Sequence, residues 1–129
     1  MKKQYAIGID LGGTNLRAAL VSEEGTVVKK VKVPSSDSMA ESLLKSISDV
    51  FTEDVAGVGV GAAGFIDKER GVVIESPNIP SIKGLNIVET VRERFGVPVF
   101  LENDANVAAL GERWMGEGKT LRSFVLITL

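Results

Sequence analysis

Hydrophobic and polar positions along the chain follow two different periods, and their succession predicts an α/β fold. Residues 5–9, 16–21 and 26–33 alternate as strands do, and tight polar turns join them into an antiparallel meander. Residues 39–52 carry apolar side chains at helical spacing, behind a Ser38–Glu41 pair that is typical of a capping box. The pattern therefore predicts three strands followed by a helix that covers one face of their sheet.

The second half of the chain continues with strands and helices in turn. A buried strand, a hairpin, a long loop with two prolines, a helix closed by glycine and another strand are predicted, in that order, at 55–60, 64–75, 76–86, 86–95 and 97–101. A third helix begins after Asn103 or Asp104, and a last apolar strand is predicted at 123–129. We expect the strands at 55–60 and 97–101 to lie parallel to the first one.

Composition narrows the class of protein. The 129 residues are 44% hydrophobic, which suits one domain with a real core, and the net charge of −2 offers no basic face for nucleic acid. The sequence has no Cys and no His, so acid–base chemistry falls to Asp, Glu, Lys or Tyr. The N-terminus does not resemble a signal peptide, and no apolar run is long enough for a membrane helix. We expect a cytoplasmic protein without a membrane partner.

The first informative motif follows the first strand, where the chain reads Asp10-Leu11-Gly12-Gly13-Thr14. Adjacent glycines let backbone N–H groups converge on an anion, the Thr14 hydroxyl adds a donor, and the Asp10 carboxylate can hold Mg²⁺ directly or through water. The alternative is a plain hairpin in which Gly-Gly serves only the turn. The combination of Asp before the glycines and Thr after them favours phosphate binding.

The second motif is Glu102-Asn103-Asp104-Ala105-Asn106, between a strand and a helix. Asn103 or Asp104 must cap the helix, but a cap needs one polar residue and this stretch has four. Because open α/β sheets bind ligands at the carboxyl ends of their strands, Asp104 is a candidate general base for a substrate hydroxyl, with Asn103 orienting the substrate. Helix capping by Asp104 is the alternative.

Two further stretches carry weaker signals. Residues 59–64 spell G-x-G-x-x-G, but no helix opens within the motif, so a dinucleotide site is not expected there. We interpret Gly64 and its neighbours as room for something small to approach the strand end. In the loop at 76–86, Asn78 lies between two prolines; it is either a ligand contact or a turn residue that bonds its own backbone.

The order of elements and these motifs resemble a known family. Three meander strands, helix, strand, hairpin, helix, strand, helix and a final strand resemble the ribonuclease-H-like half of the actin and hexokinase superfamily, a mixed five-stranded sheet with flanking helices. Within it, residues 9–15 and 102–112 resemble the ROK family of repressors, uncharacterised reading frames and sugar kinases, and most closely its bacterial glucokinases. The resemblance covers essentially the whole chain. It implies that 1–122 form the N-terminal lobe and that 123–129 open a second lobe.

The resemblance also implies site roles. Asp10 would help to hold Mg²⁺, and Gly12, Gly13 and Thr14 would approach the phosphates of ATP. Asp104 would deprotonate the hydroxyl of glucose or a related hexose. The residues expected to touch the sugar are Gly64, Asn78, Asn103 and Asp104.

The chain departs from the family pattern in several ways. A second phosphate loop, an adenosine pocket, a Glu-x-Gly-His run and a Cys/His zinc site all lie outside this sequence, so no zinc site is expected in it. We therefore expect the isolated chain to be inactive. We also expect it to self-associate through an exposed face, for example as a homodimer. The alternative to a kinase lobe is a non-catalytic sugar-binding or regulatory member of the same family.

Overall fold

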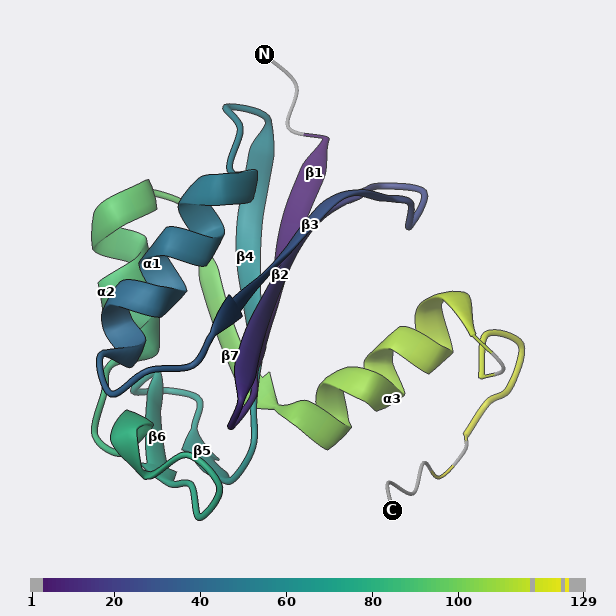
Figure 1. Ribbon diagram of the computed structural model, residues 1–129. Coiled ribbons are helices and arrows are strands. Elements are labelled where there is room, and N and C mark those ends of the chain that lie inside the picture. Colours follow the sequence, from purple (N-terminus) through teal and green to yellow (C-terminus); the bar gives the residue numbers. More distant parts are fainter. Residues whose placement is uncertain (1–3, 117, 124, 126–129) are drawn as a thin grey trace.

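The computed structural model describes residues 4–116, 118–123 and 125 (Figure 1). Over this part the elements are, in chain order, β1 (Tyr5–Leu11), β2 (Asn15–Ser22), β3 (Val27–Pro34), α1 (Met39–Val50), β4 (Val55–Ala62), β5 (Phe65–Asp67), β6 (Val72–Glu75), the 3-10 turn η1 (Pro80–Ile82), α2 (Ile87–Phe95), β7 (Val99–Asn103) and α3 (Asp104–Met115). None of the helices described is long and apolar enough to cross a membrane.

A five-stranded mixed sheet with the strand order β3-β2-β1-β4-β7 forms the centre of the fold. β1, β2 and β3 are paired antiparallel, whereas β1 with β4 and β4 with β7 are parallel pairs. β5 and β6 form a separate small hairpin beyond the carboxyl ends of the parallel strands (Figure 1). The predicted mixed five-stranded sheet with flanking helices is confirmed, and so is the parallel direction of the two later strands, although β7 pairs with β4 and not with β1.

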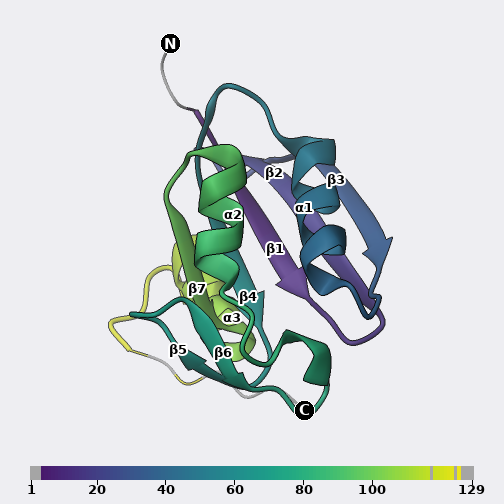
Figure 2. The ribbon, with the colours of Figure 1, turned by 90° about the vertical axis from the view of Figure 1, so that its left-hand side faces the viewer.

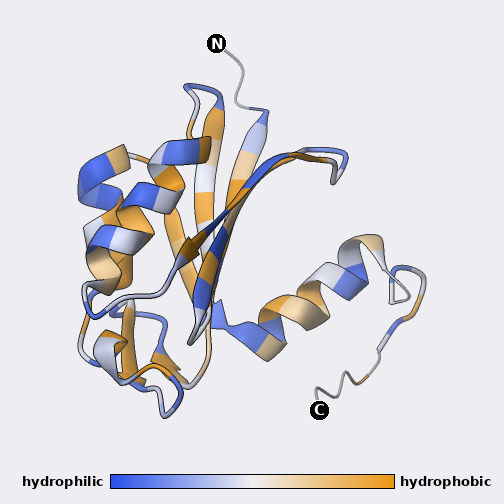
Figure 3. Ribbon diagram, in the orientation of Figure 1, coloured by the Kyte–Doolittle hydropathy of each residue, from blue (hydrophilic) through white to orange (hydrophobic). Residues whose placement is uncertain are grey.

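α1 and α2 lie side by side on one face of the sheet (Figure 2). Leu43 and Ile47 of α1 and Val91 of α2 have no exposed surface, and both helices turn their hydrophobic sides towards the strands (Figure 3). Each such side chain contributes roughly 1.5–3 kcal/mol when it leaves water. This face therefore holds the core that fixes the strand positions.

α3 lies on the other side of the sheet and is packed quite differently. None of its residues is buried, and the helix extends away from the end of β7 (Figure 1). Its apolar side chains are open to solvent, since Leu110 and Trp114 remain more than half exposed. Besides the junction at its first turn, α3 meets the rest of the fold through Val107 against Gly61 of β4 and through Met115 near Gly25 of the turn between β2 and β3.

Several predicted boundaries were wrong, for identifiable reasons. The first helix ends at Val50 rather than at 52, because Phe51 takes an extended backbone and places its ring 5.0 Å from the ring of Phe95. The strand predicted at 97–101 is displaced to Val99–Asn103, since Pro98 has no N–H for the ladder. It therefore extends as far as the second polar motif.

The predicted capping box at the start of α1 is also wrong. Ser38 is the N-cap residue by position, with backbone angles of φ −98° and ψ 69°. Its side chain makes no capping hydrogen bond. The backbone carbonyl of Ser38 accepts the first intrahelical bond, from the N–H of Ser42 at 3.2 Å, as at any helix start. The predicted strand at 123–129 falls mainly outside the described residues, so the lobe boundary at 122 stays a prediction.

Candidate active site

The ends of three parallel strands lie next to one another. Leu11 of β1 is in register with Ala62 of β4, and Ala62 is in register with Asn103 of β7. The turns that follow these residues therefore leave the sheet at a single edge, where α/β sheets commonly bind ligands. Both sequence motifs are at this edge, although Thr14 and Glu102 are 88 positions apart in the sequence.

The glycines of the first turn are required by close packing. A Cβ atom on Gly12 would overlap the carbonyl oxygen of Asn15, and one on Gly13 would lie 3.3 Å from the carbonyl oxygen of Asn78. Neither glycine has a positive φ, so the turn is not of the type I′ that a simple Gly-Gly hairpin adopts. The close contact at Gly12 lies within the turn itself, as the plain-hairpin alternative also requires, whereas the contact at Gly13 places the loop at 76–86 next to the first turn.

Ser35 stabilises the same turn, a role that no motif in the sequence indicates. Its backbone N–H donates to the carbonyl of Thr14 at 2.9 Å, and its hydroxyl donates to the carbonyl of Gly12 at 2.7 Å. Ser35 thus engages acceptors of the turn and none of its donors, which are the groups an anion needs. Asp10 is exposed beside this turn, with its carboxylate 3.7 Å from the guanidinium of Arg17.

Asn103 has the capping role that the sequence left open between two residues. Its side-chain oxygen accepts from the N–H groups of Ala105 at 3.0 Å and Asn106 at 3.4 Å. Its amide group donates to the carbonyl of Gly64 at 3.1 Å, which connects the start of α3 to the end of β4. Since Asn103 is the cap, Asp104 is not required for it. The Asp104 side chain is exposed and accepts from the N–H of Ala105 at 2.8 Å.

Gly64 occupies a position that no other residue fits. Its φ is +111°, and a Cβ atom would overlap the carbonyl oxygen of Glu75 on β6. The glycine lets the chain turn sharply from β4 into the hairpin while its own carbonyl receives the Asn103 amide. The sequence correctly indicated a close approach at this strand end, but here the approaching group is the backbone of the hairpin itself.

We expect Gly64→Ala to lower the free energy of unfolding by about 2 kcal/mol or more, because it combines backbone strain with a backbone clash. Gly84→Ala is the matched control: Gly84 has φ +78° but nothing within 4 Å of a Cβ atom. That variant carries the strain alone and should cost about 1 kcal/mol. Urea unfolding of the three proteins measures both values, and equal losses would show that the clash is relieved by movement.

Glu102 also makes several polar contacts at this edge. Its carboxylate accepts from the side chain of Asn106 at 3.1 Å, from Lys68 Nζ at 2.9 Å and from the N–H of Asn103 at 2.9 Å. These contacts, the first most of all, lower the pKa of Glu102 from 4.5 to about 2. The polar excess of the motif pointed towards Glu102, whereas nothing in the sequence pointed towards Lys68, which lies in the turn between β5 and β6.

The lowered pKa of Glu102 makes stability depend on pH. The folded state binds a proton less tightly than the unfolded chain, so the carboxylate stabilises the fold above about pH 4.5 and loses this effect as the pH falls towards about 2. We expect the stability difference between the natural chain and Glu102→Gln to shrink over that window. Urea unfolding midpoints at a series of pH values measure it, and a constant difference would contradict the prediction.

The described chain does not enclose a metal or a ligand by itself. Within 4–116, 118–123 and 125, no group of three or more His, Cys, Asp or Glu side chains could hold a metal ion. The lone carboxylate of Asp10 fits the way Mg²⁺ is commonly held, by one or two carboxylates together with substrate phosphates. The residues Asn78, Asn103 and Asp104 lie on an open surface and not in a closed pocket.

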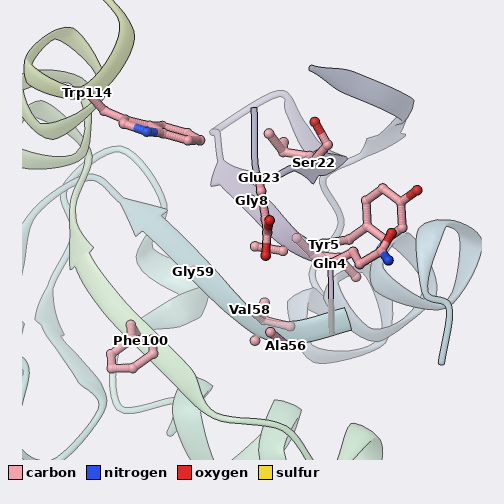
Figure 4. A pocket seen from close by; sticks show the side chains of 14 residues that line it. Gln4, Tyr5, Gly8, Ser22, Glu23, Ala56, Val58, Gly59, Phe100 and Trp114 are labelled. Atoms are coloured by element: carbon pink, nitrogen blue, oxygen red, sulfur yellow. The ribbon is translucent and has the colours of Figure 1, made fainter. Parts of the chain in front are cut away.

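Two large hollows lie on the face of the sheet that α1 and α2 leave uncovered. One of about 630 Å³ lies between the middle of the sheet and α3, with Gly8 and Gly59 at its floor and Phe100 and Trp114 at its side (Figure 4). A neighbouring one of about 880 Å³ reaches the side chains of Asp10 and Glu102 at the site edge. Both are mainly apolar, so they describe an uncovered sheet face rather than the polar site.

Comparison with known proteins gives consistent matches. The sequence pattern of the ROK family matches residues 6–129. The chain is 39% identical to a glucokinase of Thermotoga maritima over 138 aligned positions, which cover 100% of the chain and 43% of that protein. It is 29% identical to a xylose repressor of Caldicellulosiruptor bescii, covering 95% of the chain and 33% of the repressor.

A solved structure agrees with these matches. The ROK family glucokinase of Streptomyces griseus, in complex with glucose and AMPPNP, superimposes with a TM-score of 0.81 at 36% identity. The superposition covers 90% of this chain and 38% of that one. The chain thus spans about two fifths of the length of the glucokinases that it matches.

Proposed function

The chain belongs to the ROK family, and on this premise we propose that it forms the N-terminal lobe of an ATP-dependent hexose kinase. The observation that carries the proposal is the shared strand edge, where the turn at Gly12 and Gly13 follows β1, Asn103 caps α3 and binds the carbonyl of Gly64, and the carboxylate of Asp104 is exposed. The glucokinase of Thermotoga maritima and the glucokinase structure with glucose and AMPPNP resemble the chain over nearly all its length, which supports glucose or a related hexose as the substrate.

In the proposed reaction, Asp104 accepts the proton of a sugar hydroxyl as the oxygen attacks the γ-phosphorus of ATP. The bond from that phosphorus to the bridging oxygen of ADP breaks, so the products are a sugar phosphate and ADP. Asn103 and Asn78 orient the sugar, and the turn at Gly12, Gly13 and Thr14 approaches the phosphates. Mg²⁺, held with the help of Asp10, would neutralise phosphate charge.

A second candidate function is regulatory sugar binding without turnover. The similarity to a xylose repressor favours it, because the same lobe occurs in a family member of that name. Retention of an exposed acid directly after the Asn103 cap favours the kinase instead, since sugar binding alone does not need a proton acceptor.

A coupled assay of ADP release from the natural full-length protein, with glucose, other hexoses and pentoses, tests the proposal. We expect ATP-dependent phosphorylation of at least one hexose. Binding of a sugar by calorimetry without ADP release would favour the regulatory alternative. Absence of both would overturn the proposed function.

A further inference from the structure

We propose that Glu102 and Lys68 form a positioning pair that fixes Asp104 relative to the β5–β6 hairpin. The inference rests on the proposed function, because it assigns to this pair an effect on the proton acceptor of that reaction. Neither residue is placed in contact with the sugar or with ATP. Their role is to hold the first turn of α3, on which Asp104 lies.

The first step of the argument is the geometry of the Glu102 carboxylate. One oxygen, Oε1, accepts from the N–H of Asn103 and from the amide of Asn106, so it ties the end of β7 to the first turn of α3. The other oxygen, Oε2, accepts from Lys68 Nζ at 2.9 Å. The two donors to Oε1, Asn103 and Asn106, lie on either side of Asp104 in the sequence. The Glu102 carboxylate therefore restrains the chain on both sides of Asp104.

The second step is that α3 has few other means of being held. None of its residues is buried, and its apolar side chains Leu110 and Trp114 are largely exposed. Its contacts beyond the junction are few among the described residues: Val107 lies against Gly61 of β4, and the Met115 side chain lies near Gly25 in the turn between β2 and β3. Changes at the β7–α3 junction should therefore move the first turn of α3 more than similar changes would move α1, which has a buried face.

The third step is that the junction and the hairpin are joined at two points. Asn103 binds the carbonyl of Gly64, just before β5, and Glu102 binds Lys68, just after β5. One contact alone would leave α3 able to rotate about it, whereas two contacts on either side of a three-residue strand define an orientation. A displacement of about 1 Å at a reacting group can cost roughly 10²-fold in rate, so such an orientation has consequences for Asp104.

Glu102 itself is unsuited to be the proton acceptor. All its described contacts are with hydrogen-bond donors. Its pKa of about 2 keeps the carboxylate ionised at neutral pH. A carboxylate engaged by three donors and neutralised by a lysine serves as an anchor. This separates its role from that of the exposed Asp104.

Steady-state kinetics of the natural full-length protein test the inference. We expect Glu102→Ala to lower kcat by about 10- to 100-fold, within the cost of a misplaced catalytic group, while KM for the sugar changes less than about threefold. Lys68→Met, which leaves the Oε1 contacts in place, should lower kcat by a few-fold. Lys68→Arg should restore it, because a guanidinium can still donate to Oε2. In the double variant, Glu102→Ala with Lys68→Met, the decrease in log kcat should be smaller than the sum of the decreases in the two single variants.

Lys45→Met is the matched control, since it removes another exposed lysine–carboxylate pair, with Asp49 at 3.5 Å on α1, away from the junction. It should leave kcat unchanged. Should Glu102→Ala fail to fold, Lys68→Met and Lys68→Arg still decide the matter. The inference is overturned if Lys68→Met keeps the natural kcat, or if the loss appears in KM alone. If the natural protein has no kinase activity, the proposed function is overturned. That outcome is distinct from the failure of the inference, which requires an active natural protein.

Discussion

Asp104→Asn in the natural full-length protein should lower kcat by about 10²- to 10⁴-fold while KM for the sugar stays within a few-fold of its natural value. The amide that replaces the carboxylate can still exchange hydrogen bonds with a sugar hydroxyl, but it cannot accept the proton. The fold should be unaffected, because the side chain is exposed and Asn103 already caps α3. A coupled assay for kcat and KM, with thermal unfolding in parallel, measures the three quantities.

Asp49→Asn is a control of the same chemical change on the opposite side of the sheet, where Asp49 pairs with Lys45 on α1. It should leave both kinetic constants unchanged. Near-normal turnover of Asp104→Asn would show that Asp104 contributes only charge at the start of a helix, where an acid stabilises by a few tenths of a kcal/mol to about 1 kcal/mol. The mechanism proposed above would then be wrong.

Much of the fold could be predicted because it depends on local patterns. The meander, the helix with Leu43 and Ile47, and the parallel strands follow from apolar periodicity and from turn residues, and these signals agree with one another. The errors fall at element ends. Ser38 had the right residue type for a cap but the wrong backbone angles, and these angles are set by the incoming chain rather than by the motif.

Candidate site residues could be identified from the sequence only where they form a motif of consecutive residues. The motifs at Asp10 and Asp104 could be identified in this way. Lys68 and Ser35 could not be identified, because their partners are distant in the sequence. Lys68 binds Glu102, 34 positions away, and Ser35 binds Gly12, 23 positions away. Nor does the sequence show that Gly13 lies against the backbone of Asn78. Such contacts depend on strand register, which the sequence specifies only through the whole sheet.

The uncovered face of the sheet leads to the second large effect, which concerns the 129-residue chain taken alone. Phe100 and Leu110 are 69% and 62% exposed beside the two hollows, and the glycines Gly8 and Gly59 leave the middle of the sheet without side chains. An apolar surface of this kind favours association with another surface. We therefore expect the isolated chain to self-associate at micromolar concentrations.

Sedimentation of the isolated chain tests this expectation with a matched pair of variants. Phe100→Ser should shift the chain towards the monomer, because it removes an aromatic ring at the edge of the hollow. Phe65→Ser removes an equally exposed ring, at 71%, from the hairpin and should not. If both variants associate as the natural chain does, a different surface is responsible.

We also expect the isolated chain to show no sugar phosphorylation and to bind ATP weakly or not at all. The described residues offer the turn at Gly12 and Gly13 for phosphates, but Asn78, Asn103 and Asp104 lie on an open surface, and nothing in the described part encloses a nucleotide base. Without closure, water competes for every polar contact and the electrostatic gain of a dry site is lost. Calorimetric titration with Mg-ATP and with glucose, followed by the coupled assay, measures binding and turnover. Micromolar ATP binding with measurable turnover would contradict the prediction and would mean that two copies of the chain complete the site across the face at Phe100.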